Sequence, residues 1–418
     1  MSAGVLSGGR AFGVFACFAG AYFMSYGLRS VNAVIAPDLL AQFGLTIAQL
    51  GSLSSAYFLS FAAMQLPLGI WLDRIGARRT DAVLLVIAAL GCAVFALADG
   101  LPVLWIGRAL VGVGVAGALM SALKGYRFWY PAPRQQSLAA WMLVAGTLGA
   151  LSVTVPVQAA LPVVGWRGIF WIAAALVLAA AIALWFGVPR DEERSLSPPA
   201  GNGAIWLGYA QVFASAHFWR YGLVAIIVLS SFMSMQTLWA GPWFVQVLGL
   251  DARASARALF AFNFVLMLSF LALGAVLPRL ERAGWSVGRL IPVVVVAVIG
   301  VETAIALYRV PSAWMLWLLL AVVATPLTAV QPFVSLGFPQ ALTGRAYTAF
   351  NLLTFSSAFA NQWLFGVVVD AFKAGGADAA HAFGRALLTW QGPQLAVLAA
   401  LLFWRTQAPS TAGDVHRH

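Results

Sequence analysis

Charged side chains are scarce in this chain. Of its 418 residues only 9% are Asp, Glu, Lys or Arg, whereas 62% are hydrophobic. A soluble globular domain carries about 25% charged residues, and a chain this poor in them cannot cover its surface with polar groups in water. The mean hydropathy of +0.90 therefore indicates that a lipid bilayer is the solvent of the folded protein.

Cysteine and histidine are also rare, with two and four residues. Cys17 and Cys92 fall inside apolar segments, so we expect no structural disulfide and no metal site. The histidines are spread over a connecting segment, a loop and the C-terminal tail, away from any nucleophile or ligand cluster. We therefore expect no enzyme active site and no cofactor.

Twelve apolar runs are long enough to cross the hydrocarbon core, which takes about 20 residues. Every backbone group in lipid needs a partner within its own segment, so each run predicts a helix. The sequence therefore predicts an all-α integral membrane protein with twelve transmembrane helices. Their expected ranges are 11–37, 46–72, 81–98, 101–123, 137–161, 166–187, 219–248, 255–278, 289–308, 312–338, 346–371 and 382–405.

The formal net charge of +11 could indicate nucleic-acid binding in a soluble protein. Here its distribution matters more. With an even number of spans both termini share one side, and that side holds about 16 basic residues against about six on the other. Cytoplasmic loops carry such an excess. The charge therefore predicts a bacterial-type inner-membrane protein with both termini in the cytoplasm and without a nucleic-acid partner.

One long polar connection, 188–218, divides the runs into two sets of six. Its charged start, Pro189-Arg-Asp-Glu-Glu-Arg194, is followed by Ser, Pro and Gly, which is typical of a linker. Within it, 204–218 could form an amphipathic helix on the membrane surface. We expect an N-terminal six-helix bundle at 1–187, a cytoplasmic linker at 188–218, and a C-terminal bundle with a short cytoplasmic tail at 219–418.

A short basic segment lies between the second and third runs. It reads Gly69-Ile-Trp-Leu-Asp73-Arg74-Ile-Gly76-Ala-Arg78-Arg79. The pattern G-x-x-x-D-R-x-G-x-R-R at this place resembles the signature loop of the major facilitator superfamily of transporters. The segment Trp105-Ile-Gly-Arg108 with its following glycines resembles the fourth helix of that family, whereas the antiporter motif of its fifth helix is absent. The resemblance implies two pseudo-symmetric six-helix bundles with a site between them.

The resemblance also implies a gating role for Asp73, Arg74, Gly76 and Arg78. In the family the aspartate caps the N-terminus of the eleventh helix and pairs with a nearby arginine, which holds the cytoplasmic side shut. A carboxylate at a helix N-terminus is stabilised by the helix dipole. Topological anchoring alone would explain Arg79, but it does not explain the aspartate.

Two arginines lie deep within the apolar runs, well away from their ends: Arg29 in the first and Arg108 in the fourth. Ionisable residues in a membrane are costly and are therefore candidates for function. At 1.5 Å per residue both fall about 7 Å to the periplasmic side of the midplane, and the resemblance places both on cavity-lining helices. Arginine stays charged and its planar fork matches carboxylate or phosphate. We therefore expect an anionic small-molecule substrate; the alternative is that either arginine pairs with helix-end carbonyls.

Other polar side chains extend this candidate site. Asn32 lies one turn after Arg29 on the same face. Leu28 stands at the position where the organic-anion symporters that this segment resembles carry an acid, so the coupling ion is left open. Amides and one aromatic residue on other cavity helices complete the candidate set: Gln65, Gln236, Trp239, Gln331 and Asn351. Each amide could equally join two helices. Glu302, near the periplasmic end of the ninth run, is expected to reach the membrane interface; the alternative is a functional role.

The sequence thus predicts a monomeric secondary active transporter in a lipid bilayer. It would move a small organic or inorganic anion by alternating access, with a proton as one candidate coupling ion. The alternative is an exporter of drugs, siderophores or metabolites with the same fold. A non-transporting membrane sensor is a third interpretation.

Overall fold

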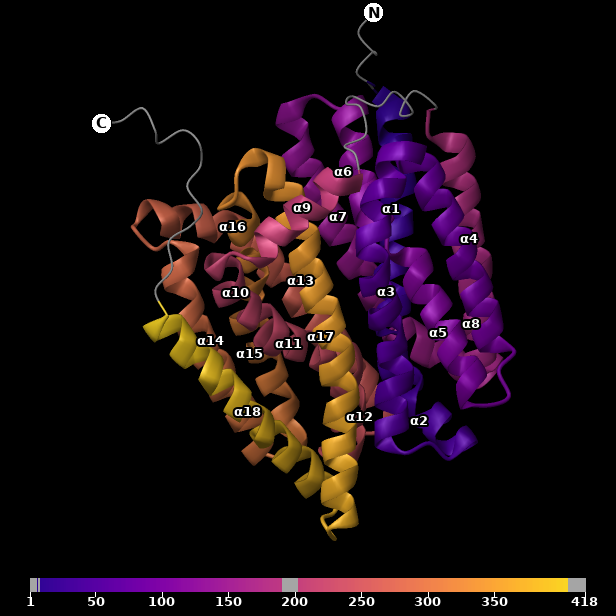
Figure 1. The fold of residues 1–418 in the computed structure, drawn as a ribbon. Helices are drawn as coiled ribbons and strands as arrows, with labels where there is room; N and C mark the ends of the chain where they lie inside the picture. Colours follow the sequence, from indigo (N-terminus) through magenta and orange to yellow (C-terminus); the bar gives the residue numbers. More distant parts are fainter. Residues whose placement is uncertain (1–5, 7, 190–201, 405–418) are drawn as a thin grey trace, which may run out of the picture.

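Helices account for nearly all of the chain in the computed structural model, which describes residues 6, 8–189 and 202–404. The helices before residue 190 lie together and are drawn in indigo to magenta in Figure 1. They are α1 (Gly8–Ser30), α2 (Asn32–Phe43), α3 (Ile47–Ile75), α4 (Ala77–Ala96), α5 (Leu101–Val115), α6 (Ala118–Trp129), α7 (Ala132–Ser152) and α8 (Val155–Gly187).

The second half begins with α9 (Asn202–Phe213). A continuous helical crossing with two π-helical turns follows: α10 (Ala216–Leu223), η2 (Val224–Leu229), α11 (Ser230–Ser234), η3 (Met235–Trp239) and α12 (Ala240–Gln246). The remaining elements are α13 (Ala252–Arg282), α14 (Val287–Leu307), η4 (Pro311–Ala313), α15 (Trp314–Ala324), η5 (Thr325–Ala329), α16 (Val330–Leu336), α17 (Gln340–Ala374) and α18 (Ala379–Phe403).

The number of membrane crossings agrees with the sequence prediction. Eleven described helices are long and apolar enough to span a bilayer, and a shorter apolar helix covers Ser137–Ser152. Several predicted spans are built from two pieces, because α1 continues into α2 and α5 into α6. Within α8 the backbone of Gly165 has a φ of 65°, which separates the fifth crossing from the sixth. The prediction of an all-helical, multi-span membrane protein is confirmed.

Local sequence signals explain several helix ends. The side chain of Thr46 accepts a hydrogen bond from the backbone of Gln49, whose own side chain accepts from the Thr46 backbone, and this capping box starts α3. Between α3 and α4 only Gly76 lies outside a helix, with a φ of 91°. Glycine adopts this backbone without steric cost, so the connection is one residue long, shorter than the gap at 73–80 between the second and third predicted runs.

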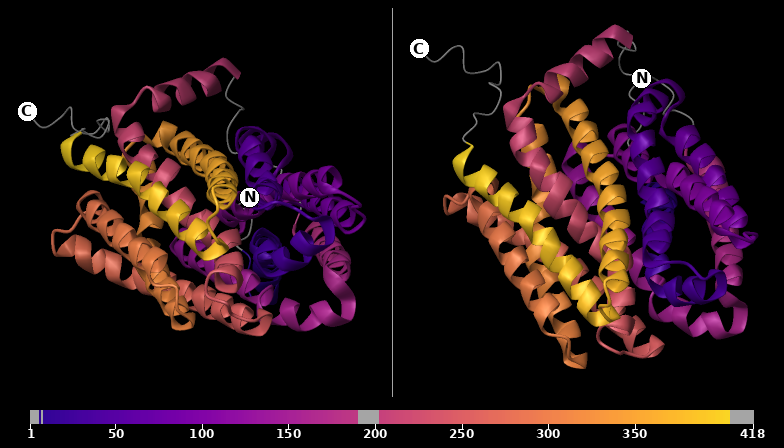
Figure 2. Two further views of the ribbon diagram at one scale, coloured as in Figure 1. Left: turned by 90° about the horizontal axis from the view of Figure 1, so that it is seen from below. Right: turned by 60° about the horizontal axis from the view of Figure 1, so that its bottom comes forward.

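The two halves stand side by side, as the views of Figure 1 and Figure 2 agree. We call the end at which α1 and α17 begin the upper end, as drawn in Figure 1, and the end at which α17 finishes the lower end. α3 and α17 pack against one another along the boundary between the halves. α9 packs beside α17, where Tyr209 and Thr348 share a hydrogen bond of 2.8 Å, so a helix occupies the part of the linker in which the sequence indicated one.

Candidate functional site

Arg29 lies in a cluster of aromatic rings at the boundary between the halves. Its guanidinium carbon is 4.4 Å from the centre of the Tyr26 ring and 5.3 Å from that of Phe355. Tyr57 and Phe61 of α3 lie within 6 Å as well. The side chain is only 8% exposed, and no described carboxylate is within ion-pair distance of it. The arginine is therefore buried among rings whose faces attract a cation.

Arg108 occupies the neighbouring position on α5. Its guanidinium carbon is 5.4 Å from the same Tyr57 ring that Arg29 approaches, so the structure brings the two predicted arginines together. Its Nη1 donates a hydrogen bond to the Leu28 carbonyl at 2.7 Å, and the residue is 1% exposed. This hydrogen bond joins α5 to α1 just before the break at Val31. It matches the alternative for Arg108, a contact with a helix-end carbonyl.

The halves meet beside Arg29 through an aromatic pair and a chain of amides. The rings of Phe61 and Phe355 are 4.2 Å apart between centroids. One helical turn toward the upper end, the Asn351 amide donates to Gln65 at 3.4 Å and accepts from Gln331 at 2.6 Å. Three predicted site residues from both halves are therefore joined, one helical turn from the aromatic pair that Arg29 approaches.

The other predicted contacts lie elsewhere. Asn32 is fully buried and donates to Ser54 at 2.8 Å, so it joins α2 to α3. Gln236 donates to Asn263 at 3.3 Å within the C-terminal half. Trp239 is completely buried against Phe365 and Phe383. In this conformation Trp239 is therefore part of the packed core rather than the wall of an open cavity.

The predicted gating segment has two kinds of environment. Arg74 is exposed, whereas Arg78 is buried, donates to the Trp185 carbonyl at 2.7 Å and lies over the Trp185 ring. Arg78 thus fastens α4 to α8 within one half. The side chain of Asp73 lies outside the described residues, so its expected contact with the eleventh helix stays a prediction. The Lys124 ammonium donates to the Leu72 carbonyl near the end of α3, a favourable place for a cation.

At the lower end the halves approach each other too closely for side chains at three glycines. A Cβ on Gly241 of α12 would lie 2.1 Å from the Ala33 carbonyl oxygen. A Cβ on Gly51 would be 2.7 Å from the Gln362 carbonyl, and one on Gly366 would be 2.7 Å from that of Ile47. Here backbone packs directly on backbone between the halves. The lower end is therefore closed along α2–α12 and α3–α17.

The expectation that Glu302 reaches the membrane interface is wrong. A residue reaching toward the membrane interface would be exposed, yet Glu302 is 1% exposed. It points into the contact between α14 and α18, where its Oε2 accepts a hydrogen bond from Gln394 at 2.7 Å. The amide on α18 explains the difference, because it offers a polar partner inside the bundle that the sequence of α14 alone does not reveal.

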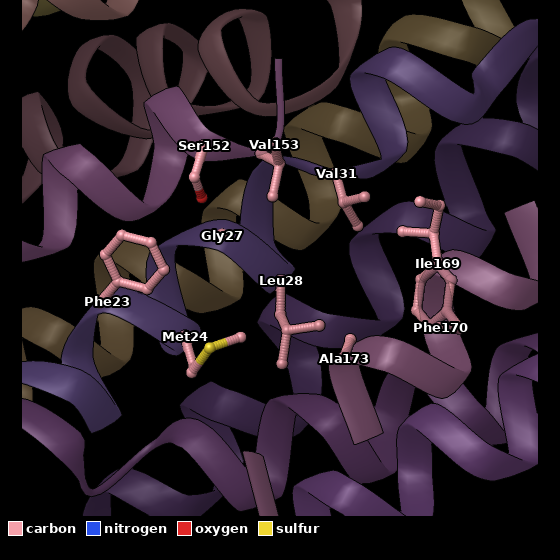
Figure 3. Close-up of a pocket in the computed structure, with 10 residues that line it drawn as sticks. All are labelled: Phe23, Met24, Gly27, Leu28, Val31, Ser152, Val153, Ile169, Phe170 and Ala173. Carbon is pink, nitrogen blue, oxygen red and sulfur yellow. The ribbon is translucent and has the colours of Figure 1, made fainter. Parts of the chain in front are cut away.

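A separate pocket lies between α1, α7 and α8 (Figure 3). Its lining is apolar except for the Ser152 hydroxyl, and it carries no charged side chain, so it offers an anion no counter-charge. The residues around it are Phe23, Met24, Gly27, Leu28, Val31, Ser152, Val153, Ile169, Phe170 and Ala173.

The aromatic surroundings of Arg29 were missed in the sequence. Tyr26 could have been found, because it precedes Arg29 by three residues and shares its helix face. Phe61 and Phe355 carry no such signal, since phenylalanines are common in apolar spans and their pairing depends on how the two halves meet.

A polytopic helical membrane protein with two six-crossing halves and an arginine at their boundary has the form of a membrane carrier. Residues 18–360 match the family model of the Major Facilitator Superfamily. The chain therefore belongs to the major facilitator superfamily.

Individual relatives share low sequence identity with this chain. A probable nitrate/nitrite antiporter of Thermus thermophilus is 27% identical over 55% of this chain and 53% of its own length. A hexuronate transporter of Escherichia coli is 27% identical over 41% of this chain and 40% of its own. The chain thus spans about half or less of the length of these curated relatives. A solved bacterial homologue of the human lysosomal transporter Spinster, inward-facing and occupied, superposes with a TM-score of 0.77 at 16% identity, covering 95% of this chain and 97% of that one.

Proposed function

We propose that this protein is a secondary active transporter that carries a small anion across a bacterial inner membrane by alternating access. The observation that carries the proposal is the environment of Arg29. Its guanidinium is buried at the boundary between the halves, is surrounded by aromatic rings, and has no carboxylate partner among the described residues. Belonging to a family of transporters favours transport over the enzymatic and sensor interpretations.

The physical argument rests on the cost of burying an unpaired charge. A cation removed from water without an anion is strongly disfavoured, and a ring face compensates only part of this cost, by about 0.5–2 kcal/mol. A bound anion would supply the missing partner, and the arginine fork can hold a planar oxyanion through two parallel hydrogen bonds. The names of the relatives, a nitrate/nitrite antiporter and a hexuronate transporter, are those of carriers of oxyanions.

The order of contacts supports an anion that carries further oxygen atoms. From the upper end, a solute would first meet the amides of Gln65, Gln331 and Asn351. The rings of Phe61 and Phe355, both within 6 Å of the Arg29 guanidinium, lie one helical turn further on. Amides can donate to or accept from hydroxyl and carbonyl groups. We infer that Arg29 holds the acidic group and that the amides contact the remainder of the substrate.

The proposed cycle follows from the closed lower end. The basic-residue asymmetry favours a cytoplasmic upper end, so the tight contacts of Gly241, Gly51 and Gly366 would close the periplasmic side. Transport requires these contacts to separate while the upper end closes. A proton remains a candidate coupling ion, and we propose that the protein works as a monomer.

A thermal-shift screen of the purified protein tests the proposal. Nitrate, glucuronate and galacturonate are compared with cationic drugs, because ligand binding raises apparent stability by mass action. We expect an anion to raise the melting temperature of the wild-type protein and not that of Arg29→Ala. Stabilisation by cationic drugs alone would favour the alternative, an exporter.

A further inference from the structure

A second buried ionisable group lies away from the central site. Glu302 of α14 faces Gln394 of α18, and both side chains are almost completely buried. The Gln394 amide nitrogen donates to Glu302 Oε2 at 2.7 Å. Next to this pair, Gln391 donates to the Thr303 hydroxyl at 2.7 Å. The two helices are therefore joined by polar contacts inside the apolar bundle.

The other side-chain oxygen of each residue in this pair has no hydrogen-bond donor. Glu302 Oε1 and Gln394 Oε1 are both buried and both lack a hydrogen-bond partner. An amide oxygen and a carboxylate oxygen are acceptors only, so neither can satisfy the other while the carboxyl group is ionised. Buried polar atoms in native proteins are nearly always paired, and two unpaired acceptors on one bonded pair therefore require an explanation.

No nearby cation accounts for the two unpaired oxygens. Apart from α18, the elements that pack most extensively against α14 are α15, α16 and η5, and their sequences contain no titratable side chain. Tyr221 of α10 also lies beside α14, but at Gly288, near the opposite end of the helix from Glu302. The basic residues nearest along the chain are engaged elsewhere. Arg289 donates to the Gly284 carbonyl and Arg309 to the Ala306 carbonyl.

The facing helix offers no counter-charge either. On α18, the Arg385 guanidinium carbon lies 5.9 Å from the centre of the Phe372 ring, and His381 lies beside Asp378 at the start of the helix. No described basic group is within ion-pair distance of Glu302.

One proton satisfies both oxygens. A protonated carboxyl group has one O–H donor and keeps its acceptor oxygen. We propose that Glu302 is a proton-binding site, in which Glu302 Oε1–H donates to Gln394 Oε1 while Glu302 Oε2 accepts from the Gln394 amide. The result is a closed ring of two hydrogen bonds without a net charge, which removes the large cost of an ionised group in an apolar interior.

This inference goes beyond the proposed anion transport and does not depend on it. The bound ligand is a proton taken from water, and no other atom is exchanged. The site lies on α14 and α18, whereas the candidate substrate site lies on α1, α3, α16 and α17. Loss of the proton would leave two buried acceptors facing each other and would weaken the contact between α14 and α18.

Infrared difference spectroscopy of the purified full-length protein at pH 7 tests the proposal. The spectrum of wild type minus that of Glu302→Gln should contain one carbonyl band of a protonated carboxylic acid, which shifts in heavy water. Asp378→Asn serves as the control, because Asp378 is exposed and should give carboxylate bands only. A Glu302→Gln difference that contains carboxylate bands without an acid band would overturn the proposal.

A second variant keeps the test valid if Glu302→Gln does not fold. Gln394→Leu removes the amide and leaves the acid in place. The acid band should then move to higher frequency, because the O–H and C=O groups lose their partners. If Glu302 is ionised, neither variant changes any acid band, and the proposal fails.

Discussion

Asp370 on α17 accepts a hydrogen bond from the backbone N–H of Ala48 in the first turn of α3, with a distance of 2.8 Å between Oδ2 and the nitrogen. The first N–H groups of a helix lack partners within the helix, and a carboxylate there also interacts favourably with the helix dipole. The two residues belong to different halves. Their contact therefore stabilises the closed lower end and is lost when the halves separate there.

We predict that Asp370→Ala shifts the conformational equilibrium toward an open lower end. Loss of a cap costs about 0.5–2 kcal/mol, which corresponds to a shift of about 2- to 30-fold in the ratio of the two states. Spin labels at Ala41 and Ala374, both exposed near this end, report the separation by electron–electron resonance. The long-distance population should grow in the variant.

Asp378→Ala is the matched control for this experiment. Asp378 also caps a helix N-terminus at the lower end, by accepting from the His381 backbone at 2.8 Å, but it does so within one half. The hydrogen bonds from His381 hold the pKa of the Asp378 carboxyl below its usual range, so the cap is charged at pH 7. An equal shift of the distance distribution in both variants would argue against a specific role of the Asp370–Ala48 hydrogen bond in holding the lower end closed.

Substitution of Arg29 should directly weaken binding of the anionic substrate. Removing one partner of a buried charged pair costs about 2–5 kcal/mol, so Arg29→Ala should weaken anion binding by about 30-fold or more. Arg29→Lys should also fail largely, because a point charge cannot reproduce a two-pronged contact. Arg108→Ala should cost stability rather than specificity, since Arg108 holds the Leu28 carbonyl. Binding of radiolabelled anion to purified variants measures this, and normal binding by Arg29→Ala would contradict the proposed site.

Topology can be tested by labelling single cysteines in intact cells. Ala77, the middle of the basic segment, is completely buried and would report poorly. Ala283 is exposed at the upper end and Ala374 at the lower end. We expect an impermeant thiol reagent added outside the inner membrane to label Ala374→Cys and to spare Ala283→Cys. The opposite pattern would invert the proposed orientation.

Gly241→Ala should hinder closure of the lower end. The new methyl carbon would overlap the Ala33 carbonyl oxygen, which is backbone and cannot move aside alone. Overpacking costs about 1–3 kcal/mol, so transport measured in proteoliposomes should slow by about tenfold. Gly300→Ala is the control, because no described atom outside the neighbouring backbone of its own helix lies within 4 Å of a Cβ at that position. Equal rates for the two variants would contradict the close contact.

Asp73→Asn tests the gate implied by the basic segment. We expect the fold to persist and transport to slow, since loss of a charged helix cap costs about 0.3–2 kcal/mol. Uptake in proteoliposomes and thiol accessibility at both ends are the measurements. Unchanged values of both would argue against a gating role for Asp73.

The sequence predicted the fold better than the site, for a physical reason. Length and apolarity of a segment decide whether it crosses a membrane, and both are local, so the crossings could be counted in advance. The pairing of Arg29 with Phe355, or of Gln65 with Asn351, depends on how two halves separated by hundreds of residues meet. Glu302 shows the same limit, because its partner Gln394 lies on another helix and turns an expected surface residue into a buried one.

The contact of Phe61 with Phe355 also bears on how the cell keeps its energy. A carrier in an inner membrane lies across a voltage and a proton gradient, and any continuous file of water through it would short-circuit both. Two rings with centroids 4.2 Å apart leave no room for a water molecule between them. If the protein is the proposed inner-membrane carrier, we expect this aromatic pair to block the passage of ions past Arg29 between turnovers.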